Sequence, residues 1–143
     1  MSYRDTSSFG KRMEYQIIGD ILAQGLDVYI PLIDDHGVDC VVKTPDGRFI
    51  EIQIKARSRQ AKQVGCFTVD NHINQKNNFY FIFYSEIVNT RWVFTSEEFL
   101  NNSNVNKSGK HSGQRKITLV TKKGVISKKY KSFIKNDFAF LIN

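Results

Sequence analysis

The sequence is poor in residues that cross-link or break a chain, and it has no long apolar run. Only two cysteines and two prolines occur among 143 residues. Cys40 and Cys66 lack the spacing of a metal site, so we expect two reduced core residues and no disulfide framework. No apolar stretch approaches the roughly 18 residues of a membrane-spanning helix, and no cleavable leader precedes the first predicted helix. We therefore expect an intracellular, cytoplasmic protein without membrane contact. A chain of 143 residues can bury one core without space for a second, so we expect one domain, residues 1–143.

Acidic residues are scarce in the last third of the chain. The whole sequence carries a formal net charge of +7, and the only acid from Phe99 onward is Asp137. Ten basic residues share that segment: Lys107, Lys110, Arg115, Lys116, Lys122, Lys123, Lys128, Lys129, Lys131 and Lys135. This asymmetry favours a polyanionic partner, and nucleic acid is the simplest candidate. The alternative is an ordinary basic protein with solvated lysines.

A sharp turn is encoded by Thr44-Pro-Asp-Gly47. Proline presets the backbone of the second position, aspartate suits the third, and glycine takes the left-handed conformation of the fourth. This order predicts a type I turn closed by a glycine bulge. We therefore expect residues 36–44 and 48–56 to form a β-hairpin whose loop is Pro45 to Gly47.

The length of that loop decides which residues of the hairpin face each other. If Thr44 pairs with Arg48, Asp39 lies opposite Gln53 on the same side of the sheet, with Cβ atoms about 4.5 to 5.5 Å apart. Two oxygen-bearing side chains at that distance can contact one small cation. A two-residue loop would shift the register by one and place them on opposite sides.

The second strand of the hairpin alternates polar and apolar residues. From Phe49 to Ala56, Glu51, Gln53 and Lys55 alternate with three isoleucines. Because successive side chains of a strand point to opposite faces, the isoleucines enter a core and the three polar groups share the other face. An edge strand with one wet face would give the same pattern, but the predicted partner strand favours a functional site.

A third polar group comes from the predicted N-terminal helix, Phe9 to Gln24, between a Ser7 or Ser8 cap and a stop at Gly25. The apolar stripe of this helix comprises Met13, Ile17, Ile18, Ile21 and Leu22. Glu14 points into the middle of the stripe. A carboxylate on a packing face is costly unless it meets a cation, a metal or good donors, so we expect Glu14 to face a charged group. The alternative is that it reaches water near a frayed first turn.

In order and spacing, Glu14, Asp39 and Gln53-Ile-Lys55 resemble the core pattern of the PD-(D/E)xK nuclease superfamily, which is an acid on a first helix, an acid on a strand, and acid-x-Lys on the next strand of a hairpin. The Gly-Val-Asp39 approach is most similar to the Holliday-junction resolvase, restriction and homing endonuclease branches. The resemblance covers residues 9–57 and departs where glutamine replaces the usual acid, although Gln-x-Lys occurs in some branches. It implies an α/β fold with a restriction-endonuclease-like core, a central mixed β-sheet flanked by helices.

The resemblance also implies a catalytic site formed by Glu14, Asp39, Gln53 and Lys55. Phosphodiester hydrolysis needs a hard cation to polarise the phosphoryl oxygen, and carboxylate or amide oxygens are its matching ligands. We expect Mg²⁺, with Mn²⁺ able to substitute, held by Asp39, the Gln53 carbonyl and Glu14, the last acting through water. Lys55 is expected to be the catalytic cation that stabilises the attacking hydroxide and the developing phosphorane charge.

Three further acids lie close to this pattern in the sequence. Glu51 shares the polar face of the strand but lies about 7 Å along it from Gln53, so we expect a supporting role. Asp34 and Asp35 stand in a loop bounded by Pro31, and two acids in such a loop are more often solvated turn residues.

Two basic segments are candidates for contacts with the nucleic-acid backbone. The first leads away from the proposed site through Arg57, Arg59 and Lys62. The second surrounds a loop rich in Asn, Ser, Gly and Lys, from Asn101 to Gly113, and its candidate residues are Lys107, Lys110, His111, Arg115 and Lys116. A solvated surface loop has the same composition, so the sequence does not assign base recognition to it.

The rest of the sequence predicts the elements around the site. Expected strands are Leu26 to Ile30, Phe67 to Val69, Phe79 to Tyr84, Arg91 to Thr95 and Arg115 to Val120. Thr95-Ser-Glu-Glu98 has capping-box spacing and should open a short helix through Leu100. Apolar residues between Tyr130 and Leu141 predict a C-terminal amphipathic helix for the core or a subunit contact.

Together these features predict a Mg²⁺-dependent endonuclease that acts on DNA. The alternative from another class is a non-catalytic DNA-binding module that keeps the basic surface while Gln53 marks a decayed site. An RNA substrate is a third hypothesis. Cutting both strands of a duplex normally needs two sites, so the family resemblance leads us to expect a homodimer or homotetramer.

Overall fold

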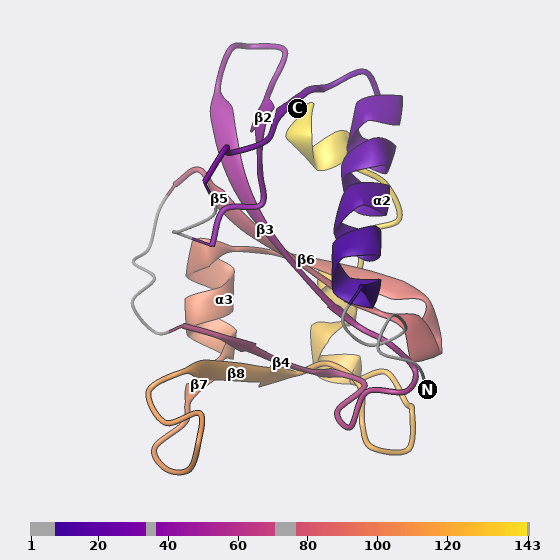
Figure 1. Ribbon diagram of the computed structural model, residues 1–143, viewed down its shortest axis with the longest axis vertical. Helices are drawn as coiled ribbons and strands as arrows, with labels where there is room; N and C mark the ends of the chain where they lie inside the picture. Colours follow the sequence, from indigo (N-terminus) through magenta and orange to yellow (C-terminus); the bar gives the residue numbers. More distant parts are fainter. Residues whose placement is uncertain (1–7, 34–36, 71–76, 143) are drawn as a thin grey trace.

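Two β-sheets form the frame of the molecule (Figure 1). The computed structural model describes residues 8–33, 37–70 and 77–142. The larger sheet has the strand order β1-β2-β3-β5-β6 and consists of β1 (Asp27–Tyr29), β2 (Cys40–Lys43), β3 (Phe49–Arg57), β5 (Phe79–Ser85) and β6 (Thr90–Thr95). Strands β3 and β5 are parallel and the other neighbours are antiparallel, so the expected mixed sheet is confirmed.

The second sheet is antiparallel and has the order β4-β8-β7. Its strands are β4 (Cys66–Val69), β8 (Arg115–Thr118) and β7 (Asn104–Val105). The sequence predicted β4 and β8 as strands but did not separate them from the main sheet, and it missed β7. In Figure 1 this sheet forms a layer of its own at the lower end of the molecule.

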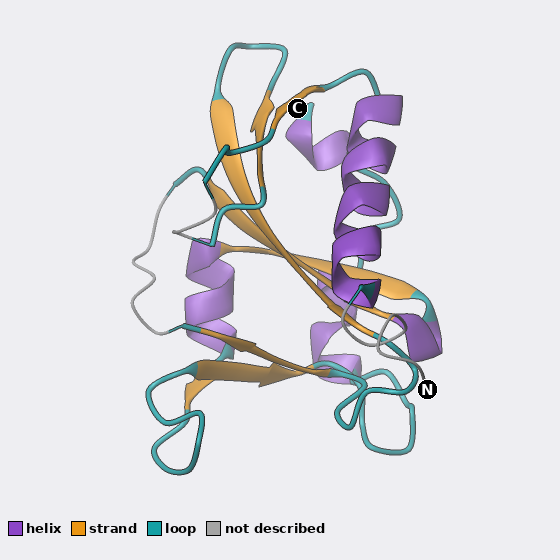
Figure 2. Ribbon diagram, viewed as in Figure 1, coloured by secondary structure: helices purple, strands orange, loops and turns teal. Residues whose placement is uncertain are grey.

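Two apolar cores lie on the two faces of the larger sheet. On one face, α2 (Phe9–Ala23) packs Ile17, Ile18 and Ile21 onto the isoleucines of β3. On the other, a mainly aromatic cluster from β5 and β6 packs against the smaller sheet and against Phe99 of α3 (Ser96–Asn102). Figure 2 shows α2 and α3 on opposite sides of the larger sheet, so the expected α/β fold with flanking helices is confirmed.

The hairpin β2–β3 has the predicted register. Cys40 pairs with Ile52 and Lys43 with Phe49, and the Thr44 N–H donates to the Arg48 carbonyl at 2.8 Å. Gly47 has a φ of +87°, which is the left-handed conformation expected at the end of this turn. The loop therefore consists of three residues, and continuing the register beyond Cys40 sets Asp39 opposite Gln53.

The C-terminal helix prediction is wrong. This part of the chain forms two short 3-10 segments, η2 (Lys128–Phe133) and η3 (Ala139–Leu141), in addition to η1 (Glu86–Val88) earlier in the chain. Between η2 and η3 the backbone pairs with β6 instead of with itself, since Ile134 forms a β-bridge to Trp92 and the Lys135 N–H donates to the Arg91 carbonyl. The helical spacing of apolar residues is thus satisfied by packing at η2 and η3, where Tyr130 and Leu141 are buried.

Among the described residues, none of the helices has the length and apolar character of a membrane span.

Helix α3 begins at the predicted capping box, in which the Thr95 hydroxyl accepts from the Glu98 N–H at 3.1 Å and the Glu98 carboxylate accepts from the Thr95 N–H at 2.9 Å. The helix runs two residues beyond the predicted end at Leu100.

This capping box yields a prediction about stability. Replacing Thr95 by alanine removes an acceptor from the first turn of α3, so the free energy of unfolding should fall by about 1 kcal/mol. Urea unfolding followed by circular dichroism measures the change. Thr95→Ser keeps the hydroxyl and should stay near the wild type, and equal losses in both variants would contradict a capping role.

Candidate active site

Asp39 lies where β2 begins, and the chain holds its carboxylate at the edge of the hairpin ladder. The Asp39 N–H donates to the Ile52 carbonyl at 2.8 Å. The Ile54 N–H donates to Asp39 Oδ2 at 2.7 Å. The carboxylate therefore accepts a hydrogen bond from a backbone N–H of β3 that a backbone carbonyl would accept if β2 were longer. This bond orients the Asp39 side chain toward β3.

Gln53 carries a buried carbonyl oxygen that has no partner among the residues that the structure describes. Its Oε1 is inaccessible to solvent and accepts no hydrogen bond from them. A buried acceptor left unsatisfied costs about 1 to 3 kcal/mol, so a cation or donor that contacts this atom binds favourably. The amide lies against Gly37, where an added Cβ would come within 3.0 Å of Gln53 Nε2. Gly37 also has a φ of +71°, which favours glycine.

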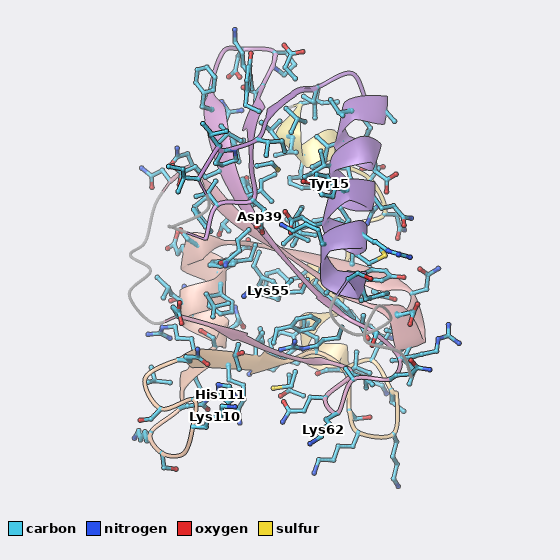
Figure 3. The ribbon with its side chains drawn as sticks, in the orientation of Figure 1. Tyr15, Asp39, Lys55, Lys62, Lys110 and His111 are labelled. Atoms are coloured by element: carbon cyan, nitrogen blue, oxygen red, sulfur yellow. The ribbon has the colours of Figure 1, made fainter. Side chains whose placement is uncertain are left out.

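Lys55 follows Gln53 on the same face of β3 and opens onto a cavity. The cavity has a volume of ≈ 460 Å³, and its lining includes Arg57, Lys62, Thr68 and His111. No carboxylate pairs with Lys55 among the side chains that the structure describes. Figure 3 shows Asp39 and Lys55 along the central stretch of the larger sheet, above the two strands β4 and β8. The ammonium is thus available to a substrate placed in this cavity.

Glu14 lies on α2, which packs on the isoleucine face of β3, opposite to the face of Gln53 and Lys55. Its side chain is only 14% exposed and its Oε1 lies 3.3 Å from Lys11 Nζ. Burial raises the pKa of the Cys40 thiol to about 12, and Asp39 and Glu14 add to this shift. Burial alone would lower the pKa of Lys11, but the attraction of Glu14, with a smaller contribution from Asp39, raises it. The charges of Glu14 and Asp39 therefore both affect the Cys40 thiol and the Lys11 ammonium.

The donor set defines what the site can bind. Among the described residues, no three His, Cys, Asp or Glu side chains are grouped closely enough to hold a metal ion. A cation here must use the Gln53 amide together with Asp39, and a carboxylate plus an unpartnered amide oxygen fits a hard ion such as Mg²⁺. Glu51 is half-buried on the same strand face, opposite Val41. Asp34 and Asp35 lie outside the described residues.

The predicted phosphate contacts fall into two groups. Arg57 and Lys62 line the Lys55 cavity together with His111, while Lys107, Lys110 and Lys116 are exposed. All three arginines have partners within the protein, and Arg57 Nε donates to the Cys66 carbonyl at 3.0 Å. Arg59 donates to Glu86 through its backbone N–H at 2.9 Å and its Nε at 3.4 Å.

Arg115 supports the end of α3. Its Nη1 lies 3.2 Å from Ser103 Oγ and 3.4 Å from the Leu100 carbonyl. These bonds satisfy a carbonyl group of the last turn of α3 and the hydroxyl group of Ser103, which follows the helix. The structure thus places Arg115 in a supporting position, away from the Lys55 cavity.

Two residues at the site were not assigned from the sequence. Gly37 was quoted only as part of the Gly-Val-Asp approach, and its contact with Gln53 depends on the folded hairpin. Lys11 is detectable in sequence as the basic residue three positions before Glu14 on the helix.

Comparisons with known proteins identify the family and support the fold. The sequence pattern of the PD-(D/E)XK endonuclease family matches residues 4–97. The chain therefore belongs to this family of nucleases. Its fold is similar to that of a bacterial homing endonuclease, I-Ssp6803I, with a TM-score of 0.62 and 21% sequence identity over 95% of this chain and 93% of that chain. No curated protein matches the sequence significantly.

The contact between Gly37 and Gln53 yields a prediction about metal binding. In Gly37→Ala the new methyl displaces the Gln53 amide, so the affinity for Mn²⁺ should fall roughly tenfold, as is usual when the support of a ligand is lost. Calorimetric titration of the protein with Mn²⁺ in the absence of nucleic acid measures this affinity.

Gly25→Ala is the matched control. Gly25 has a φ of +85° but nothing within 4 Å of an added Cβ, so this variant carries the backbone strain without the contact. It should lose stability while keeping its Mn²⁺ affinity. Equal Mn²⁺ affinities in the two variants would show that Gly37 does not position the amide.

Proposed function

We propose that the protein is a Mg²⁺-dependent DNA endonuclease that hydrolyses phosphodiester bonds. The observation that carries this proposal is the hairpin register, which sets Asp39 opposite Gln53, two residues before Lys55, while the buried Gln53 carbonyl has no partner among the described residues. Membership of the PD-(D/E)XK endonuclease family supports a nuclease. Glutamine in place of the usual acid leaves an oxygen ligand of lower charge at the same position.

Each residue has a distinct part in the proposed reaction. Asp39 and Gln53 would hold Mg²⁺ through one carboxylate and one amide oxygen. When bound, Mg²⁺ supplies positive charge beside the phosphate and promotes ionisation of water at neutral pH. Glu14, held by Lys11, would accept a hydrogen bond from a water molecule on the helix side of Asp39.

Lys55 would act on the phosphate directly. In hydrolysis the water oxygen forms a bond to phosphorus, the bond from phosphorus to one sugar oxygen breaks, and the proton from water finally resides on the leaving oxygen. The negative charge on the phosphoryl oxygens grows during this step. An ammonium that has no carboxylate partner in the described chain and borders a cavity lined by basic groups stabilises that charge.

The choice of DNA, and of more than one subunit, rests on indirect support. The net charge of +7 and the basic cavity favour a polyanion, and I-Ssp6803I, whose fold is similar, is a homing endonuclease. Cutting both strands calls for two sites, so we infer a homodimer or homotetramer. We also infer that the protein is intracellular, where a DNA substrate is found. Exposed apolar side chains beside the edge strand β1, including Tyr29, Ile30 and Phe49, support a contact between copies.

Plasmid cleavage tests the proposal. The purified protein should convert supercoiled plasmid to nicked or linear DNA with Mg²⁺ and not with chelator. Lys55→Ala should lower the rate by about 10²- to 10³-fold, because it removes charge stabilisation from the transition state. Gel densitometry over time gives the rates. Lys43→Ala is the matched control, since this exposed lysine lies at the far end of the hairpin opposite Phe49.

The remaining outcomes separate the alternatives. Cleavage that persists unchanged in Lys55→Ala would rule out this mechanism. Duplex binding without cleavage, on plasmid and on a pool of long random duplexes, would favour the non-catalytic DNA-binding module. Preferential competition by structured RNA would favour an RNA substrate.

A further inference from the structure

The three-stranded sheet β4-β8-β7 has two faces of opposite character. On the inner face, Phe67, Val69 and Ile117 are buried in the aromatic core. On the outer face, the alternate residues are polar or basic and are exposed or half-buried. Packing of the inner face alone stabilises a short sheet, so its polar outer face is available for recognition. This face carries Lys116 and, just beyond β4, the exposed Asp70, which accepts from Gln114 Nε2 at 3.1 Å.

Register places the outer-face side chains in cross-strand rows. Lys116 of β8 pairs with Thr68 of β4 on one side and with Asn104 of β7 on the other. Thr118 pairs with Cys66 in the next row. Paired residues share a face, so the first row presents a hydroxyl, an ammonium and an amide. These are groups that hydrogen-bond to base edges.

Two basic cavities border this face and connect it with the proposed active site. One, of ≈ 600 Å³, has Lys116, Thr118 and Lys122 in its lining. The other, of ≈ 460 Å³, contains Thr68 and His111 together with Lys55. Both linings include Lys62, and neither includes an Asp or Glu. The two cavities, which share Lys62, thus connect Lys55 with the outer face of the sheet.

We propose that the outer face of this sheet enters the major groove of duplex DNA, with Lys116 at a guanine edge and Lys62, Lys122 and His111 against the flanking phosphates. The major groove is about 12 Å wide and admits a two-stranded β-ribbon, and β4 and β8, whose axes are about 4.8 Å apart, form such a ribbon because β7 adds only two residues. In Figure 3 Lys110 and His111 lie toward one side of the sheet and Lys62 toward the other, as flanking backbone contacts require.

The chemistry of the face favours a duplex over a single strand. Apart from His111, the two linings contain no aromatic ring on which unpaired bases would stack. The deep, narrow major groove of A-form RNA does not admit side chains that contact bases in this way. B-form DNA is therefore the partner that this face fits. The proposal rests on DNA as substrate but does not require cleavage.

Selection from a random duplex pool in the presence of chelator tests the proposal without cleavage. The wild type should enrich a motif that contains a preferred guanine. Lys116→Ala should lose the preference at that position, with affinity for the wild-type motif lower by roughly five- to a hundredfold. Lys62→Ala and Lys122→Ala should bind all sequences more weakly, and each should reduce the slope of log affinity against log salt by about one. Lys43→Ala should behave as the wild type.

Failure of this inference is distinct from failure of the proposed function. If Lys116→Ala selects the same motif with the same affinity, or if the wild type enriches no motif, the sheet does not contact bases and the inference is overturned, whether or not the protein cuts plasmid. If the wild type enriches a motif that Lys116→Ala loses but never cuts DNA, the inference holds and the proposed nuclease function fails. Thermal melting of each variant checks that the exposed substitutions leave the fold intact.

Discussion

The functional arrangement depends on the hydrogen bonds of one turn. Thr44 is buried, its N–H and hydroxyl bond to the main chain of Arg48, and its carbonyl accepts from the Gly47 N–H at 2.9 Å. The hydrogen bond from the Thr44 hydroxyl lowers the pKa of Asp46, and the hydrogen bond and charge of Arg48 lower it further. The ionised carboxylate therefore stabilises the turn above the ordinary aspartate pKa, and this contribution is lost as the pH falls through the lowered value. A slip of one residue would send Gln53 and Lys55 into the isoleucine core.

The larger sheet gives the site its environment as well as its register. Gln53 pairs with Phe81 and Lys55 with Phe83 across the parallel β3–β5 junction, so the polar groups share a face with buried aromatic rings. The same aromatic layer supports the smaller sheet. Strand β5 thus links the proposed chemistry to the surface that we assign to recognition.

Local patterns in the sequence predicted the parts of this arrangement that depend on neighbouring residues. The turn at Thr44 to Gly47, the capping box at Thr95 and the alternation of β3 each have a physical cause within a few positions. Long-range choices were not predictable in this way. The segment around Ile134 has helical spacing, but its backbone finds partners on β6, more than 40 residues earlier in the chain. The separation of β4 and β8 from the main sheet has the same origin, because pairing between distant strands leaves no local pattern.

The candidate site was predictable to the same extent. The register of Asp39 against Gln53 follows from the turn, and the Glu14 position follows from the helical period. The internal use of Arg57, Arg59 and Arg115 was not predictable, because their partners, Cys66, Glu86 and Ser103, are brought to them only by the fold. A count of basic residues therefore overstates the surface that is available to a phosphate backbone.

The replacement of an acid by glutamine changes the balance of energies at the site. A second carboxylate beside Asp39 would repel it in the empty state, whereas the Gln53 amide adds no charge but leaves a buried oxygen unsatisfied at a cost of about 1 to 3 kcal/mol. A cation that contacts this oxygen removes that cost on binding, which offsets part of the attraction lost with the missing charge. Lys11 lowers the negative potential further by its pairing with Glu14. In the proposed enzyme, affinity for the ion therefore rests on one carboxylate and one oriented amide, and the glycine that borders the amide becomes as important as a ligand.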